Sequence, residues 1–336
     1  MAQRLRLATF NLESLDEGPD AAVPFAERAG ALRPQLQRLD ADILCLQEIN
    51  AQRSAPKKPR QLAALENLLD GTGYEGFERA VSLGLKGHGL ADHHNLVILS
   101  RWPIKSWRSL RHDLIPAPAA RITTAEPAQD VPESIAWDRP VLHAVIGLPG
   151  GADLNVINLH LRAPLASPIP GQRSAPMVWK SARAWAEGYW LSGIKRTGQA
   201  LETRFLVDSL MDEAPEALIA ICGDFNAEEN ETPIRLVRGA VEDTGNGALA
   251  GRELIALARS IAPERRYSVM HGGDRALYDH MLASRSLWAG FRHAELHNEA
   301  LVDEGAVGPD TPFSFHAPLV AEFDSTAWER PTPGKR

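Results

Sequence analysis

Ile219-Ala220-Ile221-Cys222-Gly223-Asp224-Phe225-Asn226-Ala227 joins an apolar run to a short polar turn. The apolar residues from Ala217 to Cys222 predict a strand that is buried on both faces, and Gly223 ends it. Because side chains alternate along a strand, Cys222 and Asp224 should face one way and Phe225 the other. Two interpretations fit this ending. Either Asp224 and Asn226 close a turn through local hydrogen bonds, or they carry chemistry at a sheet edge, and on this stretch alone the turn is favoured.

Other segments repeat the pattern of an apolar run that ends in a polar side chain. Leu7 to Glu13 predicts a strand that includes Asn11 near its end, and Ile43 to Ile49 predicts a strand that contains Gln47-Glu48. Three further motifs follow along the chain: Asn158-Leu159-His160-Leu161, Tyr278-Asp279-His280 and Ser314-Phe315-His316. Polar groups therefore recur at the ends of predicted strands, which favours a shared site over a single local turn.

In this order and at these spacings, the six motifs resemble those of the endonuclease/exonuclease/phosphatase superfamily of metal-dependent phosphoesterases. The resemblance runs from about Arg4 to Phe323, and six motifs in family order are far more specific than any one of them. It implies a deoxyribonuclease I-like α/β fold, a four-layered sandwich of two mixed β-sheets flanked by helices. His160 stands where the apurinic-site repair branch usually carries Tyr, so the resemblance favours the His-containing branch.

Length and composition fit one large globular unit. The chain has 336 residues, 44% of them apolar, which is enough for a sizeable core. No linker divides it, and we expect a single domain over residues 1–324. Insertions are expected at about 105–138 and 162–197, followed by a frayed tail at 325–336.

Charge, cysteines and the N-terminus limit the setting. A net charge of −7 argues against a surface that binds nucleic acid all over, although it permits a local basic patch. The two cysteines lie inside apolar strands, which predicts buried thiols and a reducing compartment. The first predicted strand begins too close to Met1 for a signal peptide, and no apolar stretch is long enough for a membrane span. We therefore expect a cytoplasmic protein, and no protein partner is implied.

The resemblance assigns metal and catalytic roles to individual residues. Glu48 would hold a hard divalent cation, with Asn11 and Glu13 nearby. Oxygen ligands of this kind favour Mg²⁺, with Mn²⁺ or Ca²⁺ as possible substitutes. Asp224 would orient or deprotonate the attacking water, and Asn226 would hold that water or a phosphate oxygen.

The imidazoles and two arginines complete the implied site. His160 and His316 would donate hydrogen bonds to phosphoryl oxygens, and Asp279 would orient one imidazole and favour its charged form. Arg139 and Arg162 are the candidate substrate-binding residues.

Phe315 departs from the family pattern, which has Ser-Asp-His where this chain has Ser314-Phe315-His316. The missing Asp normally contributes to the metal site or steadies the last His, and a phenyl ring can do neither. Three consequences stay open: weaker metal binding, recruitment of another acid such as Glu13 or Asp279, or a catalytically weakened member that only binds phosphate.

Two other groups of residues attract attention. His88, His93 and His94 precede an apolar strand, but they lack a fourth ligand at zinc spacing, so we interpret them as solvated loop residues. The segment 162–204 carries seven positive and two negative residues, and four aromatic residues are interleaved with them: Trp179, Trp185, Tyr189 and Trp190. These rings either pack onto the core or form a basic, aromatic lip that binds phosphates and bases, or a lipid surface.

The expected activity is therefore hydrolysis of phosphodiester bonds. A magnesium-dependent nuclease acting on DNA or RNA with little sequence preference comes first. A phosphatase or phosphodiesterase of inositol phosphates or phospholipid headgroups is the alternative, and a non-catalytic phosphate-binding protein is the third hypothesis. Fold resemblance does not choose among them, because substrate preference depends on the loops.

Overall fold

Two six-stranded β-sheets pack face to face in the computed structural model, which describes residues 4–18, 21–55, 57–308 and 310–328. In the first sheet the order is β17 (Phe291–Leu296), β18 (Leu319–Asp324), β1 (Arg4–Leu15), β2 (Ile43–Ile49), β4 (Asn95–Ser100) and β3 (Glu78–Val81). In the second it is β13 (Ile255–Ala256), β16 (Asp279–Ala283), β12 (Leu218–Asp224), β9 (Asp153–His160), β8 (Val141–Gly147) and β5 (Ile104–Leu110). Both sheets are mixed, since β1 pairs with β2 and β9 with β12 in parallel, whereas their other pairings are antiparallel.

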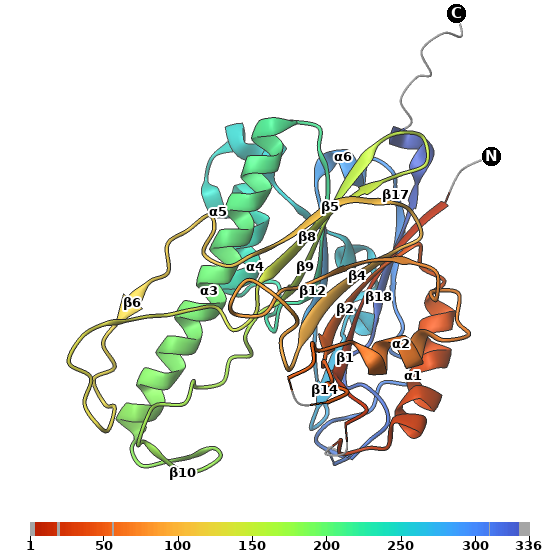
Figure 1. Ribbon diagram of the computed structural model, residues 1–336. Helices are drawn as coiled ribbons and strands as arrows, with labels where there is room; N and C mark the ends of the chain where they lie inside the picture. The colour runs from red at the N-terminus through yellow and green to blue at the C-terminus, as the bar shows by residue number, and fades with distance from the viewer. Residues whose placement is uncertain (1–3, 19–20, 56, 309, 329–336) are drawn as a thin grey trace, which may run out of the picture.

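Helices cover the outer face of each sheet (Figure 1). Helices α1 (Phe25–Leu39) and α2 (Ala63–Leu69) pack on the first sheet, and α3 (Ala182–Glu213) and α4 (Thr232–Arg238) pack on the second. The predicted four-layered α/β sandwich is thus confirmed. Shorter elements include α5 (Val241–Thr244), α6 (Arg285–Trp288), η1 (Gly247–Arg252), η2 (Leu257–Ser260), η3 (Pro263–Arg265), β14 (Val269–His271) and β15 (Asp274–Ala276).

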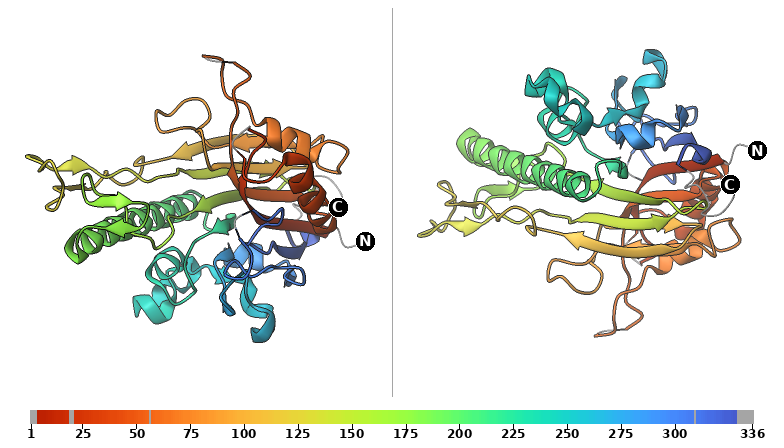
Figure 2. Two further views of the ribbon diagram at one scale, coloured as in Figure 1. Left: turned by 90° about the horizontal axis from the view of Figure 1, so that it is seen from below. Right: turned by 90° about the horizontal axis from the view of Figure 1, so that it is seen from above.

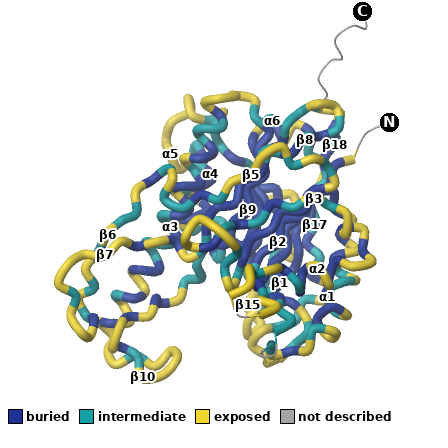
Figure 3. Tube along the Cα trace, viewed as in Figure 1, coloured by how far each residue is buried: buried dark blue, intermediate teal, exposed yellow. Residues whose placement is uncertain are grey.

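The buried layers follow the alternation of side chains along the strands. Cys45 and Cys222 both lie in the apolar core between the sheets, as free and buried thiols. Phe225 lies in the cluster beneath α3 and α4 instead, on the opposite side from Cys222, as expected from strand parity. Figure 3 shows this buried centre with the exposed segments around it. Each fully buried large apolar side chain contributes about 1.5–3 kcal/mol, so the two sheets are firmly held together.

Strand pairing brings the polar strand ends together. In the first sheet Asn11 pairs with Gln47, and in the second Asp224 pairs with both His160 and Asp279. A buried amide contact joins the two sheets just behind them, because Gln47 Nε2 donates to Asn158 Oδ1 at 2.7 Å. The functional residues of both sheets therefore face the same end of the sandwich.

The bounds of the two excursions from the sandwich differ from those expected. Residues 104–110 form β5 of the second sheet, so the segment expected as an insertion from about 105 leaves the sheet only after Leu110. It carries β6 (Ala119–Ala120) and β7 (Glu133–Ser134). The second excursion contains β10 (Arg173–Ala175) and β11 (Val178–Trp179) and then enters α3 at Ala182, well before the expected boundary at 197.

The end of the chain is also more ordered than expected. Ser325–Trp328 forms a short 3-10 helix, η4, and Trp328 Nε1 donates to the backbone oxygen of Ser286 at 2.8 Å. The expectation of a frayed tail is therefore wrong for residues 325–328, and residues 329–336 lie outside the described part of the chain. Within the described residues, no helix has the length and apolar character that crossing a bilayer requires.

Candidate active site

Several residues at the strand ends adopt the left-handed backbone conformation. The φ angles are +49° at Glu13, +53° at Ser14, +61° at Glu48, +59° at His94 and +48° at Asn226. A non-glycine residue with positive φ is uncommon and costs on the order of 1–3 kcal/mol, so such residues persist only where the surroundings fix them. Their clustering at one end of the sandwich marks this end as the candidate site.

Gly223 shows why the polar turn after β12 needs a glycine. Its φ is +140°, and a Cβ at this position would lie 2.0 Å from the backbone oxygen of Leu159 on the neighbouring strand. The close approach of β9 and β12 therefore excludes a side chain here. It also brings Asp224 directly beside His160, the last residue of β9.

Asp224 accepts hydrogen bonds from two amides of different sheets. Asn226 donates to it through the backbone N–H at 2.7 Å and through Nδ2 at 3.0 Å, and Asn11 Nδ2 donates at 3.1 Å. Asn226 therefore closes a local turn on Asp224, as the first interpretation of this stretch predicted, and a role of both residues in chemistry stays a prediction. Burial, and to a lesser extent the neighbouring Asp279 and Glu48, raise the pKa of Asp224 to about 7, although His316 opposes the shift.

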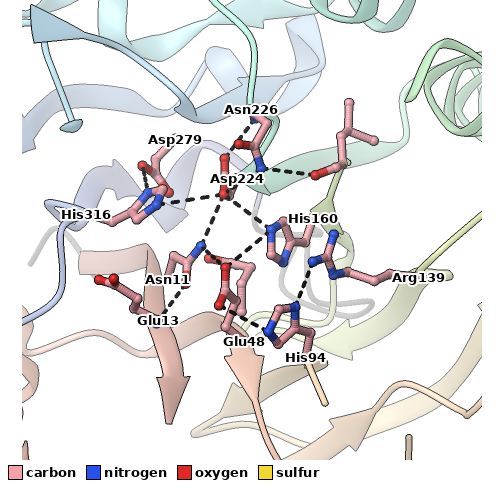
Figure 4. Close-up of polar contacts among 12 residues, drawn as sticks. Asn11, Glu13, Glu48, His94, Arg139, His160, Asp224, Asn226, Asp279 and His316 are labelled. Carbon is pink, nitrogen blue, oxygen red and sulfur yellow. Dashed lines mark hydrogen bonds and ion pairs between the residues drawn. The ribbon is translucent and has the colours of Figure 1, made fainter. Parts of the chain in front are cut away.

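Glu48 lies opposite Asp224, at the end of the other sheet (Figure 4). Its Oε1 accepts from Asn11 Nδ2 at 3.2 Å, and its Oε2 accepts from the backbone N–H of Ser14 at 3.0 Å. Burial alone would raise the pKa of Glu48. Electrostatic attraction to His160, His94 and other basic neighbours outweighs burial and lowers the pKa to about 2, so this carboxylate is charged.

His160 and His316 approach Asp224 from opposite sides. His160 Nε2 lies 3.4 Å from Asp224 Oδ2 and 3.5 Å from Glu48 Oε1, and burial lowers its pKa well below 6.5. His316 Nε2 lies 3.9 Å from Asp224 Oδ2, and His316 Nδ1 lies 2.8 Å from Asp279 Oδ2. Although burial disfavours the charged imidazole, the carboxylates of Asp279 and Asp224 raise the pKa of His316 to about 10. The site thus pairs a neutral imidazole with a charged one.

Phe315 turns its ring into the interior, where it is buried. Its backbone N–H donates to Glu13 Oε2 at 2.6 Å, so the acid at the end of β1 reaches the loop that lacks the family Asp. Ser314 ties the same loop to β1, because its hydroxyl donates to the backbone oxygen of Asn11 at 2.8 Å. Burial raises the pKa of Glu13.

The sequence itself matches the Endonuclease/Exonuclease/phosphatase family over residues 8–301. The chain belongs to this family. No curated protein matches it. Solved structures that resemble it include a Bacteroides vulgatus endonuclease/exonuclease/phosphatase at 13% identity, with 95% of this chain and 98% of that chain covered and a TM-score of 0.55. An AP endonuclease from Archaeoglobus fulgidus (17%, 95% and 99%, 0.51) and a Neisseria 3' phosphatase bound to product DNA hairpin (18%, 95% and 99%, 0.50) are similar in fold as well.

Membership of the endonuclease/exonuclease/phosphatase family was predicted from the motifs and is confirmed. The assignment to its His-containing branch stays a prediction. At these identities the solved structures establish the fold alone, so the roles of individual residues depend on the geometry of this chain.

His94 belongs to the candidate site, although its sequence context did not indicate this. It does lie in the loop before β4 and is partly exposed, but it also contacts the site: Arg139 Nη2 donates to its Nδ1 at 2.7 Å, and its Nε2 lies 3.1 Å from Ser14 Oγ and 3.5 Å from Glu48 Oε2. The sequence signal was its position directly before Asn95, which pairs with Ile49 next to Glu48. Because the sequence does not show that β2 pairs with β4, it does not reveal that His94 lies beside Glu48.

The donors present suit an oxygen-ligated cation. Nitrogens of His94 and His160 also lie near Glu48. A guanidinium can only donate hydrogen bonds, so the contact from Arg139 places the proton of neutral His94 on Nε2. The Nε2 atom that faces Glu48 then has no free lone pair for a metal. The carboxylates of Glu48 and Glu13 are the remaining anionic donors of the predicted metal set. Asp279 Oδ1 is a further carboxylate oxygen that is buried without a hydrogen-bond partner in the described structure.

Asn11 fits the predicted metal set differently. Its Nδ2 bridges Glu48 and Asp224, and its Oδ1 accepts from the backbone N–H of Glu13 at 2.9 Å. To ligate a cation through oxygen, the amide must turn and break that last bond. In the arrangement seen here, Asn11 positions the two carboxylates.

Arg162 lies at the rim and not in the centre. Its Nη1 donates to Asp138 Oδ2 at 2.6 Å, and Lys195 Nζ donates to Asp138 Oδ1 at 2.6 Å. Arg196, the next residue of α3, donates to the backbone oxygen of Asn226 at 2.6 Å and so supports the turn after β12. Lys195 and Arg196 were expected only as two of the positive charges of an insertion, because their partners, Asp138 and Asn226, are distant along the chain.

Proposed function

We propose that this chain is a divalent-metal-dependent phosphoesterase that hydrolyses phosphodiester bonds of nucleic acid, as an endonuclease with little sequence preference. The observation that carries the proposal is the convergence of Asp224, Glu48, His160 and His316 at one end of the sandwich, with Asp224 within 4 Å of both imidazoles. Those groups supply the acid, base and hydrogen-bond donors that in-line hydrolysis of a phosphodiester requires.

Each side chain has a separate task in the proposed reaction. Glu48 and Glu13 would hold a divalent cation, with Mg²⁺ the best match for oxygen donors, and the cation would neutralise charge that develops on the phosphate. Asp224 accepts the proton of the attacking water, since its pKa of about 7 makes it an effective base near neutrality. Asn226 holds the carboxylate of Asp224 in place by two hydrogen bonds.

The two imidazoles complete the proposed reaction from opposite sides. His316 is protonated over the working pH range and donates to a phosphoryl oxygen, while Asp279 orients it through Nδ1. His160 donates to another phosphoryl oxygen as a neutral imidazole. Arg139 acts through His94, and Arg162 reaches the substrate from the rim.

Nucleic acid is favoured over a small phosphoester for two reasons. Two of the solved structures similar in fold are named as an AP endonuclease and as a 3' phosphatase bound to product DNA hairpin. Within this chain, Arg162 and Lys195 place positive charge at the rim, where flanking phosphates of a polymer would lie.

The replacement of the family Asp by Phe315 favours an enzyme with weakened catalysis. The contact between Glu13 and the backbone of Phe315 supports a different outcome, in which the longer acid of β1 replaces the missing Asp. On this view the protein hydrolyses phosphodiesters, and Phe315→Asp adds a competing carboxylate beside Glu13 and does not restore a lost function.

The test is a substrate panel with purified protein and Mg²⁺ or Mn²⁺. We expect cleavage of plasmid and single-stranded DNA that is abolished by chelator, by Asp224→Ala and by His160→Ala. The matched controls are Asp274→Ala and His293→Ala, which remove an exposed acid and an exposed imidazole from β15 and β17.

Two results would overturn the assignment. Turnover of inositol phosphates or choline phospholipids without turnover of nucleic acid would identify a headgroup phosphoesterase. Binding of phosphate compounds without any turnover, together with activity gained in Phe315→Asp, would identify a weakened member of the family.

A further inference from the structure

The inner face of α3 is polar where it contacts the site. Ser192, Arg196, Gln199 and Thr203 recur at intervals of three and four residues, so they form one stripe along the helix. All four are buried. Two of them contact segments next to the catalytic residues: Ser192 donates to the backbone oxygen of Ala163, and Arg196 donates to that of Asn226. This stripe is a polar seam between α3 and the loops at the strand ends.

Toward the N-terminus of α3 the same helix face carries two partly exposed aromatic side chains. Trp185 and Tyr189 stand seven residues before Ser192 and Arg196, and therefore on the same face of the helix. Their rings are stacked, with centroids 5.6 Å apart and planes inclined by 30°. Each residue is 46% exposed. Figures 1 and 2 show the reason, since this half of α3 extends past the end of the sandwich together with β10.

A pair of cations lies where α3 meets the rim of the site, since Lys195 directly precedes Arg196 on the helix and Arg162 Nε donates to Ser192 Oγ at 3.1 Å. Asp138 holds Arg162 Nη1 and Lys195 Nζ side by side, each at 2.6 Å. One carboxylate neutralises only one of the two charges, and all three side chains remain partly exposed. Arg162 follows His160 by two residues and Asp138 directly precedes Arg139, so the pair is fixed at the rim of the site.

We propose that α3 guides a single-stranded polynucleotide away from the catalytic centre, with a phosphate bound at Arg162 and Lys195 and bases stacked on Tyr189 and Trp185. The inference rests on the proposed nuclease function and specifies its substrate. Stacked aromatic rings next to backbone-binding cations are typical of sites for single strands. Seven helical residues span about 10 Å, which is the rise of about three nucleotides.

The face that carries the rings favours a strand over a lipid surface. Trp185 and Tyr189 lie seven and three residues before Ser192, whose hydroxyl accepts from Arg162 Nε at 3.1 Å, so a strand that leaves the site over Arg162 would meet the two rings next. Glu187, the acid between them in the sequence, is engaged elsewhere, because it accepts from the backbone N–H groups of Thr123 and Thr124 at 2.6 and 2.8 Å. Since paired bases have no free face along a duplex, the stacked surface accepts unpaired bases.

Binding of phosphorothioate oligothymidylates of two to twelve nucleotides tests the proposal, with fluorescence anisotropy and Mg²⁺ in the buffer. We expect the wild-type affinity to rise with length and the Trp185→Ala/Tyr189→Ala variant to lose most of that rise. Each lost ring should weaken binding of the longest oligonucleotide by roughly 5-fold or more, the lower end of measured stacking effects. Trp185→Phe should restore most of the loss from Trp185→Ala.

Phe205→Ala is the matched control, because Phe205 is equally exposed on α3 but lies outside the seam. Thermal melting verifies that each variant is folded. If the double variant and Phe205→Ala bind the twelve-nucleotide strand equally well, the guide is refuted. It is refuted also if the double variant loses binding to phosphatidylglycerol vesicles and keeps its affinity for the oligonucleotide.

These failures differ from a failure of the nuclease proposal itself. A wild-type protein that cleaves plasmid DNA while the double variant shows undiminished binding overturns the guide alone. A wild-type protein that neither cleaves nor binds nucleic acid overturns both.

Discussion

Replacing Asp279 by Asn should move the alkaline limit of activity by several pH units. Asp279 is fully buried, and its Oδ2 lies 2.8 Å from His316 Nδ1. It is the largest favourable influence on His316, whose pKa rises from 6.5 to about 10 against the cost of burial. An Asn of the same shape keeps a hydrogen-bonding group but removes the charge, so the pKa of His316 should fall toward or below 6.5.

The size of the effect follows from these two values. A group with a pKa of 10 is mostly protonated at pH 9, whereas a group with a pKa of 6.5 is protonated in about one molecule of 300. If the imidazolium donates to the phosphoryl group, Asp279→Asn should lower kcat/KM at pH 9 by roughly 300-fold but by only about 1.3-fold at pH 6. A purely structural defect would lower both by the same factor.

The same pair has a signature in stability. A raised pKa means that folding favours the imidazolium, so this contribution is complete below about pH 6.5 and is lost as the pH rises through about 10. The difference between the two pKa values corresponds to about 5 kcal/mol, at about 1.36 kcal/mol per pKa unit. Urea unfolding in chelator at pH 6 and pH 10 should show wild type losing more stability over that interval than Asp279→Asn.

Two measurements check the reasoning directly. Hydrolysis of bis(4-nitrophenyl) phosphate from pH 5 to 10 gives the rate profiles, and proton–nitrogen NMR of labelled histidines in chelator gives the titration of His316. An alkaline limb that is the same in both proteins would refute the role of His316. A wild-type His316 that titrates near 6.5 would refute the electrostatic argument itself.

Three further outcomes follow from the geometry. Glu48→Gln should weaken Mn²⁺ binding at pH 7 by at least about 10-fold by calorimetry, and the contribution of Glu48 should persist down to about pH 4 because its pKa is about 2, although protonation of Glu13, whose pKa is raised by burial, weakens binding to both proteins on the way; unchanged affinity would remove Glu48 from the metal set. Gly223→Ala should cost more than about 3 kcal/mol in urea unfolding, since its Cβ would overlap the oxygen of Leu159, and a cost below 1 kcal/mol would contradict the close approach. Arg196→Met should lower kcat by about 10-fold or more with little change in the unfolding midpoint, because it releases the Asn226 carbonyl; an unaltered kcat would show that the turn needs no such support.

Most of the sandwich was predictable because apolar strands have a clear sequence signature. β12, β9 and β2 occur close to where their apolar runs predict them, and the alternation within β12 correctly separated Cys222 and Asp224 from Phe225. The polar residues at the strand ends were visible for the same reason, since Asp224 and His160 end apolar runs. The pairing of those two residues was not visible, because sequence does not give strand order.

Helix α3 was predictable only in its C-terminal half. The apolar residues that pack on the second sheet begin with Ala200 and end with Met211, so only this half has a buried apolar face. The N-terminal half faces loops through Ser192 and Arg196, and beyond them it faces solvent. A helix whose inner face is polar has no apolar period, so the pattern that predicts helices is absent there.

The backbone geometry of the site could not be predicted from the sequence, because several of its residues adopt the left-handed conformation. Glu13 and Ser14 are not residues that favour positive φ, so their conformation is imposed by neighbours. Arg28 is one such neighbour: this buried side chain of α1 donates to the backbone oxygen of Glu13 at 2.9 Å and to that of Phe313 at 2.8 Å. It therefore links the strained turn after β1 to the loop that carries His316. An arginine in a helix gives no sequence sign of this role, yet the contact between Glu13 and Phe315 depends on both segments being held in register.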